Sequence, residues 1–381
     1  MSLPGTLLMP ILVLRSERAT DRLLRSSSRA GPREQDRGDR EAHSSAAPAP
    51  HPVGQTRSVR RYAARGDSNQ TAEHDRRALS KRRPARPADT IGTSLRPSRR
   101  RQDETSHGHI AETLQNVDPA LFVVDVSAEI TLLARIMSVP AITIRMHGDR
   151  SDPGHLAGYE AAVGMLAPFD ERIEQDDYPD WAKSRTFYSG GLCTTKDPVI
   201  SQSEARAKLG LPTDKSITLV IAGGGGSGTP YAPLTVAARA LPDALWLVAG
   251  PVHREGHETD FGNLRELGWI DNLTDYLCAA DRVVASAGDN TVHEIARAEK
   301  PFLCVPEWRY FDEQQAKAAE LAKLGAAVHL STWPASIPEW QQALRATDAL
   351  DVSILASLHN PDAAPNAARW LEGEASRLWS S

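Results

Sequence analysis

The sequence predicts an α/β protein built on doubly wound parallel sheets. Short apolar runs alternate with segments of helical period over residues 110–330, and this alternation is typical of βαβ units. Glycines or small polar residues follow several of the apolar runs, at the strand ends where open α/β sheets bind ligands. The pattern divides into a first domain at residues 108–195, a larger domain at residues 196–334 and C-terminal helices at residues 335–381.

Composition indicates a soluble globular chain, because 40% of its residues are hydrophobic and 24% are charged. No run approaches the roughly 18–20 apolar residues that cross a bilayer. The apolar start, residues 3–14, is interrupted by prolines and lacks the basic leader of a secretory signal. The three cysteines are far apart and form no metal-binding spacing, which fits a reduced, cytoplasmic compartment.

Residues 1–107 differ from the rest of the chain. They hold 22 Lys and Arg against 12 Asp and Glu, and residues 15–107 contain one aromatic residue, Tyr62. Without apolar surface to offset its chain entropy, this segment is expected to be disordered. It could be a basic interaction arm, a plain linker or a translation in a shifted reading frame. The acidic remainder of the chain argues against a nucleic-acid partner.

The first domain begins with a βαβ unit. Residues 120–125 form a predicted buried strand, residues 128–137 a helix and residues 141–144 a second strand. Another helix is expected at residues 154–165. The irregular stretch from there to Lys196 is expected to be the interdomain linker.

The second domain shows about six alternations of strand and helix. Strands are expected at residues 216–222, 244–249, 268–270, 282–286, 301–305 and 326–330, and helices at residues 203–210, 232–240, 273–280, 291–298 and 312–324. In the tail, Trp340, Trp370 and Trp379 are the expected packing anchors.

A glycine run follows the first strand of this domain. Gly223, Gly225 and Gly228 match the spacing of a dinucleotide fingerprint, which requires an acid at the end of the next strand. That strand ends at Val248–Pro251 without a carboxylate, so a nicotinamide cofactor is disfavoured. No Lys-Ser/Thr pair follows, which excludes a Walker A loop. The remaining interpretations are a tight strand–helix turn and a loop that approaches a phosphate or sugar; for the second, the candidate residues are Gly224, Gly225 and Ser227.

Residues 283–294 place an apolar strand, a small-residue turn and a helix start in succession. Backbone amides and the helix dipole then point at one position, which suits a phosphate. Glu294 lies one turn into the helix, where its carboxylate can accept hydrogen bonds from a ribose or can simply be a solvated first-turn acid. Gln314 and Gln315 are either sugar ligands or plain helix surface. The further donor-site candidates are Ile270, Ser286, Gly288, Asp289, Asn290 and Thr291.

Residues 205–331 resemble the C-terminal, nucleotide-binding domain of glycosyltransferase family 28 and of related UDP-glycosyltransferases. The strings that carry the resemblance are Gly268–Leu273, Ala280–Gly288, Thr291–Glu294, Lys300-Pro301, Val305-Pro306, Asp312–Gln315 and Leu324–Ala327. The resemblance implies the GT-B pair of Rossmann-like domains. It also implies that Ile270 contacts the base, Ser286–Thr291 the diphosphate, Glu294 the ribose, and Gln314 and Gln315 the sugar. Such enzymes take a nucleotide sugar as co-substrate and need no cofactor or metal.

Residues 117–192 resemble only the second half of that family's N-terminal, acceptor-binding domain. In related enzymes an acid at the end of a strand orients a catalytic histidine, and Asp125 occupies that position. The Gly-His loop that carries this histidine is not found in residues 1–107. His147 and Asp149, just past the strand at 141–144, are the alternative general bases. A metal bound by these two residues with Asp152 and His155 is the less favoured alternative.

Together these features predict a glycosyltransferase with an incomplete N-terminal domain that transfers a sugar from a UDP-sugar. The acceptor is an unidentified small-molecule, lipid or glycan hydroxyl, and peripheral membrane contact is allowed. One alternative is a non-catalytic nucleotide-sugar binder or an inactive remnant of such an enzyme. Another is a nucleotide-sugar 2-epimerase, which would need carboxylates around the sugar.

Overall fold

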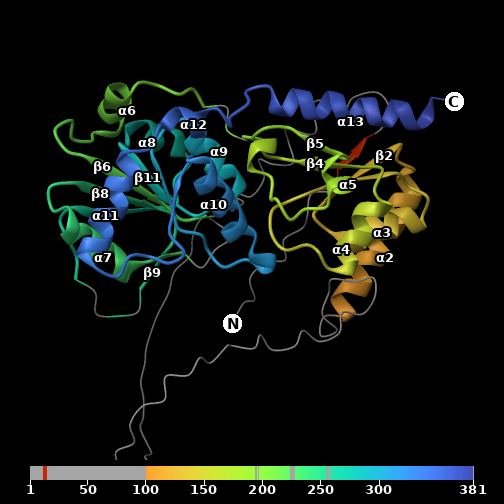
Figure 1. Cartoon of the computed structure of the whole chain (residues 1–381), viewed down its shortest axis with the longest axis horizontal. Helices are drawn as coiled ribbons and strands as arrows, with labels where there is room; N and C mark the ends of the chain where they lie inside the picture. The colour runs from red at the N-terminus through yellow and green to blue at the C-terminus, as the bar shows by residue number, and fades with distance from the viewer. Residues whose placement is uncertain are drawn as a thin grey trace, which may run out of the picture. The chain divides into compact units, whose positions relative to one another are not determined.

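The computed structural model describes residues 12–14, 100–193, 195, 197–223, 228–254, 256 and 259–380 (Figure 1). Most of the segment expected to be disordered therefore lies outside the described residues. Two described parts of it are regular: β1 (Leu12–Leu14) and the first residues of α2 (Arg100–Val117). The helix before β2 thus begins at Arg100, about ten residues earlier than the start near Ile110 that the sequence pattern indicates. The helix is held by its C-terminal half, where Leu114 is buried against Phe122 and Ala134.

The C-terminal sheet has the order β10-β8-β6-β11-β12-β13, and every neighbouring pair is parallel. Its strands are β6 (Ile217–Ile221), β8 (Leu245–Ala249), β10 (Leu264–Gly268), β11 (Arg282–Ala285), β12 (Phe302–Cys304) and β13 (Val328–His329). The strand order reverses between β6 and β11, which is the switch point where such sheets bind ligands. The doubly wound prediction is confirmed. The strand expected at residues 268–270 lies earlier, because the chain turns at Gly268 with φ +65°.

Helices connect these strands on both faces of the sheet (Figure 1). They are α6 (Gln202–Leu209), α7 (Tyr231–Ala240), α8 (Leu273–Ala279), α9 (Asp289–Arg297) and α10 (Glu313–Leu324), with the short β7 (Thr229–Pro230), β9 (Val252–His253) and η3 (Tyr310–Asp312) in the loops. Local sequence explains their limits: α6, for example, starts with a capping box formed by Ser201 and Glu204 and stops at the left-handed Gly210.

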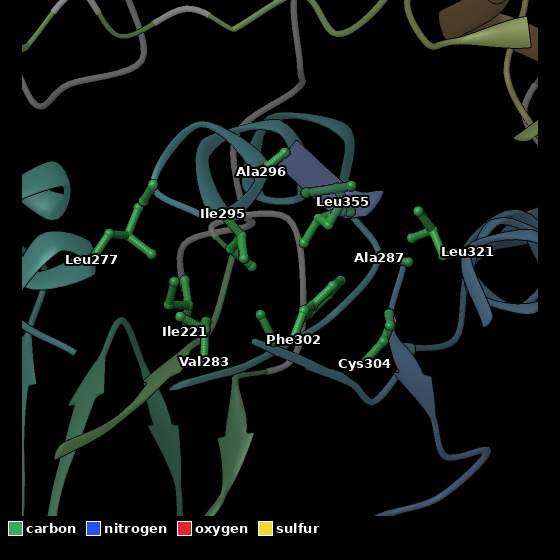
Figure 2. Packing of buried hydrophobic residues seen from close by; sticks show 14 of the residues in the cluster. Ile221, Leu277, Val283, Ala287, Ile295, Ala296, Phe302, Cys304, Leu321 and Leu355 are labelled. Carbon is green, nitrogen blue, oxygen red and sulfur yellow. The ribbon is translucent and has the colours of Figure 1, made fainter. Parts of the chain in front are cut away.

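The core lies on both faces of the C-terminal sheet. Along β8, Leu247 packs into one cluster, and Trp246 and Val248 pack into the other, as the two-residue period of a strand requires. Figure 2 shows the first cluster, in which Phe302 and Ile295 meet side chains from α10 and the C-terminal helices. Burial on both faces explains why β6, β8 and β12 are almost continuously apolar in sequence, unlike the edge strand β10.

The N-terminal sheet has the order β1-β2-β3-β4-β5, with β1 antiparallel to β2 and the other pairs parallel. Its further strands are β2 (Leu121–Asp125), β3 (Ala141–Ile144), β4 (Gly164–Ala167) and β5 (Thr186–Tyr188), and its helices are α3 (Ala128–Ile136), α4 (Pro153–Ala161), η2 (Glu171–Ile173) and α5 (Asp180–Lys183).

Two sequence predictions for this region are wrong. The helix expected at residues 154–165 ends at Ala161, because Ala162 adopts an extended backbone (φ −69°, ψ 148°), and β4 follows. A short apolar run such as Gly164–Ala167 cannot be distinguished from buried helix by periodicity. The expected linker contains β5 and two short helical turns, so it is part of the domain.

The tail forms α11 (Ile337–Asp348), α12 (Val352–Ala356) and α13 (Ala363–Trp379), and α13 returns to the N-terminal sheet. Trp340 is fully buried and Trp370 stacks on Phe187 with ring centroids 5.0 Å apart, so both are anchors as predicted. Trp379 is 63% exposed; its Nε1 donates to the Ala120 carbonyl at 2.9 Å. Among the described residues, no helix combines the length and apolar character needed to cross a bilayer.

Candidate functional site

The last glycine of the run, Gly228, lies against the loop after β8. Gly223 follows β6, whereas the candidates Gly224, Gly225 and Ser227 lie outside the described residues. Gly228 has φ +87°, and an added Cβ there would lie 2.8 Å from the Pro251 carbonyl oxygen. The backbone N–H of Thr229 donates to that same oxygen at 2.9 Å. Position 228 therefore requires glycine, because of its backbone conformation and its close approach to Pro251.

The turn after β11 leaves the N-terminus of α9 open. Ser286 is 8% exposed, and Gly288 is the N-cap with φ −65° and ψ 140°. Because Gly288 has no side chain to accept from the first amides of α9, those N–H groups are available to an anion. Thr291 is half-buried and Asn290 is exposed. The predicted diphosphate contacts therefore lie together at the switch point of the sheet.

Glu294 lies one turn further along α9. Burial raises the pKa of its carboxyl to about 7, with Arg297 lowering and Asp197 raising it to a smaller extent. The described residues supply no hydrogen bond to this carboxylate. A half-buried acid of this kind is costly unless a ligand supplies donors, so the interpretation as a solvated helix residue does not fit Glu294.

The loop before α10 has a strained backbone, and a buried side chain hydrogen-bonds to it. Phe311 and Asp312 have φ +64° and +54°, which is unusual for non-glycine residues and frequent at functional sites. Gln314 is 4% exposed, and its Oε1 accepts from the Glu307 backbone N–H at 2.8 Å. The Oε1 of Gln315 lies 3.2 Å from His329 Nε2. Gln314 is therefore not helix surface, and it holds the loop's shape whether or not its amide also binds a sugar. Ile270, at the end of the β10 turn, packs against the core.

Lys317 belongs to this site although the sequence reasoning missed it. Its side chain is 2% exposed, and its Nζ forms an ion pair with Asp289, the first residue of α9. Burial lowers the pKa of this lysine to about 7. A signal was available, since Lys317 stands three residues after Gln314 and so on the same face of α10.

The structure places the acceptor-side candidates in different environments. Asp125 is half-buried at the end of β2, and burial raises the pKa of its carboxyl. His147 is fully buried and one ring nitrogen lies 2.7 Å from the Ile173 carbonyl oxygen. Burial and then the charge of Lys317 place the pKa of His147 well below its usual value. Enclosed in this way, His147 does not lie where a base could reach an acceptor.

Asp149 belongs to a loop that contacts α10. Its Oδ1 accepts from the Ser151 hydroxyl at 2.7 Å, and its backbone N–H donates to the Phe311 carbonyl at 2.7 Å. The adjacent Arg150 donates to Glu313 at 2.7 Å. Asp152 caps α4 and contacts His155 at 2.5 Å. Within the described ranges, no three His, Cys, Asp or Glu side chains are arranged to hold a metal; the expectation of a metal-free site stays a prediction.

Part of the C-terminal half is similar in sequence to known glycosyltransferases. Residues 244–348 match the family model of the glycosyltransferase family 28 C-terminal domain. The UDP-N-acetylglucosamine--N-acetylmuramyl-(pentapeptide) pyrophosphoryl-undecaprenol N-acetylglucosamine transferase of Azotobacter vinelandii is 33% identical over 176 residues, covering 42% of this chain and 47% of that protein. The Synechococcus elongatus enzyme of the same name is 30% identical over 173 residues, covering 43% and 47%. The chain thus matches about half the length of these relatives.

Solved structures show the fold. The glycosyltransferase of kitacinnamycin superposes with a TM-score of 0.55 at 16% identity, covering 74% of this chain and 85% of that one. Arabidopsis thaliana UGT89C1, solved with UDP, gives 0.52 at 15% identity, covering 71% and 77%. The GT-B arrangement of two Rossmann-like domains and the likeness to family 28 and UDP-glycosyltransferases, both expected from the sequence, are confirmed.

Proposed function

We propose that this chain, a family 28-like protein of GT-B fold, is a glycosyltransferase that takes its sugar from a nucleotide-diphosphate donor, a UDP-sugar. One observation carries the proposal: Glu294 is a half-buried carboxylate without a protein donor, one turn from the open N-terminus of α9. A ribose supplies two hydroxyl donors to such a group, and the diphosphate of the same molecule reaches the helix amides.

The chemistry expected at this site is a single inverting displacement. An acceptor hydroxyl attacks the anomeric carbon, the bond to the diphosphate breaks, and the departing charge is stabilised by the α9 amides and dipole. This arrangement needs neither a metal nor a cofactor. On the acceptor side, Asp125 and Asp149 stay the candidates for orienting or accepting the hydroxyl proton.

For the acceptor we propose only a chemical class. The bacterial relatives carry in their names a pyrophosphoryl-undecaprenol acceptor. For this chain we propose a lipid, glycan or small-molecule hydroxyl, reached from the cytoplasm with peripheral membrane contact. Nucleic acid is not expected as a partner.

A non-catalytic nucleotide-sugar binder is the second candidate. The observation that favours it is the enclosure of His147, which removes one of the candidate bases. A binder would retain UDP affinity and would not release UDP from a UDP-sugar in the presence of any acceptor.

Calorimetric titration of the full chain with UDP, with NAD as the control ligand, tests the donor site. We expect binding of UDP alone. Glu294→Ala should weaken UDP binding by about 1–3 kcal/mol, because ribose hydroxyls would lose their acceptor. Glu372→Ala, an exposed residue of α13, is the matched control and should leave affinity unchanged. Equal UDP affinity in wild type and folded Glu294→Ala would remove Glu294 from the site.

A further inference from the structure

A buried lysine stands beneath the predicted phosphate position. Lys317 projects from α10 and contacts the carboxylate of Asp289, whose own side chain is 17% exposed. An ammonium group removed from water needs a compensating anion or it loses its proton. In the absence of a ligand, Asp289 supplies that anion.

The position of Asp289 does not suit a residue that contacts the diphosphate of the sugar donor. It is the first residue of α9, where the amides and dipole favour an anion. A bound diphosphate would bring further negative charge to this position and would repel the carboxylate. The same diphosphate would be attracted to the ammonium group beside it.

We propose that Lys317 is the phosphate-recognising cation of the donor site, and that Asp289 holds it in place until the diphosphate replaces Asp289 as its partner. The inference rests on the proposed function and deepens it. It also changes the expected role of Asp289 from donor contact to competitor for Lys317.

The surrounding charges favour this exchange. His147 interacts with the charge of Lys317 and is itself uncharged at neutral pH, because burial places its pKa well below its usual value. Burial also lowers the pKa of His293, a neighbour of His147, to about 4. Arg145, which also interacts with His147, is already paired with Glu174. Among these residues, Lys317 is therefore the cation that can exchange its protein carboxylate partner for an anionic ligand.

A phosphate series tests the proposal with the full chain. Affinities for uridine, UMP and UDP are measured for wild type, Lys317→Met, Lys317→Arg and Asp289→Asn. Lys317→Met should bind UDP about 10–100-fold more weakly, the range for one charge-assisted hydrogen bond, and uridine within about twofold of wild type. Lys317→Arg should recover most of the UDP affinity. Asp289→Asn should bind UDP as tightly as wild type or more tightly, because the competing anion is gone.

Lys317→Met is expected to weaken UDP binding and Asp289→Asn to leave it unchanged or strengthen it. This difference distinguishes phosphate recognition from a purely structural role of the pair. If the pair only stabilises the start of α9, both substitutions weaken uridine and UDP alike, which overturns the inference. Should Lys317→Met not fold, Asp289→Asn decides alone, since weaker UDP binding in that variant also overturns it. Wild type that binds no UDP would instead refute the proposed function.

Discussion

The two sheets of this molecule place their charges differently. The C-terminal sheet is parallel throughout, its central strands are buried among apolar side chains, and its ionisable site residues lie in α9 and α10, the helices that follow two of its strands. The N-terminal sheet has a three-residue antiparallel edge strand and encloses a network centred on Arg145, which is fully buried. The difference suggests that one sheet is specified by apolar packing and presents chemistry at its edge, whereas the other depends on internal polar contacts for its shape.

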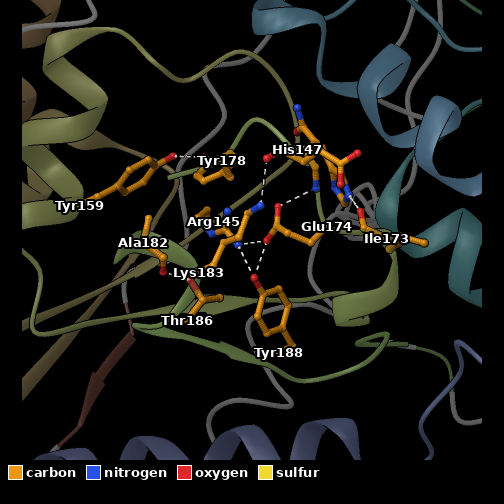
Figure 3. A network of polar contacts seen from close by, with 12 residues as sticks. Arg145, His147, Tyr159, Ile173, Glu174, Tyr178, Ala182, Lys183, Thr186 and Tyr188 are labelled. Atoms are coloured by element: carbon orange, nitrogen blue, oxygen red, sulfur yellow. Dashed lines mark hydrogen bonds and ion pairs between the residues drawn. The ribbon is translucent and has the colours of Figure 1, made fainter. Parts of the chain in front are cut away.

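The largest change in stability that would test this comparison is expected on substitution of Arg145. Its guanidinium contacts Glu174, donates to the Tyr188 hydroxyl at 3.0 Å and lies 4.0 Å from the centre of the Tyr178 ring (Figure 3). Arg145→Met would leave Glu174 buried without its cation, and the free energy of unfolding should fall by about 3–5 kcal/mol. Urea denaturation measures this loss.

The control for Arg145 is Arg377→Ala, which breaks the exposed pair with Glu374 on α13. That variant should lose at most about 1 kcal/mol. A loss for Arg145→Met no larger than for the control would mean that the network is not what holds the N-terminal sheet together.

The second effect concerns the pH dependence of stability in the C-terminal sheet. Glu294 has a folded-state pKa of about 7 against an ordinary 4.5, so the native state binds the proton more tightly than the unfolded state. Stability should therefore decrease as pH rises from about 4.5 to 7 and level off above that, by up to about 3 kcal/mol. Glu294→Gln should lack this slope. Unfolding curves across this pH range that are parallel for the two proteins would contradict the assignment.

The smallest effect is expected at Trp379, where α13 reaches the N-terminal sheet. Trp379→Phe keeps an aromatic side chain but loses the indole N–H that donates to the Ala120 carbonyl, and stability should fall by about 0.5–1.5 kcal/mol. Thermal unfolding measures the change. No change would show that Trp340 and Trp370 suffice to anchor the tail.

The sequence predicted the C-terminal sheet well because strands buried on both faces are apolar along their whole length. It missed β4, since Gly164–Ala167 reads equally well as the end of a helix, and β5, which lies among loop-forming residues. Lys317 was missed although it lies on the same face of α10 as Gln314, because its partner, Asp289, is far away in the chain. The placement of His147 past a strand end was correct, but only the structure shows that its ring is buried against the Ile173 carbonyl and interacts with the charge of Lys317.

Two glycines at close contacts constrain how this sequence can diverge. A Cβ at Gly148 would lie 2.5 Å from the Phe311 carbonyl oxygen, and one at Gly191 would lie 2.0 Å from His293 Nδ1. Neither glycine takes part in the proposed chemistry, yet both allow segments of the N-terminal half to pack directly on α9 and on the loop before α10. Homologues that share this packing should therefore retain glycine at both positions while their exposed surfaces vary freely. Loss of either one would mark a lineage in which the two halves have changed how they meet.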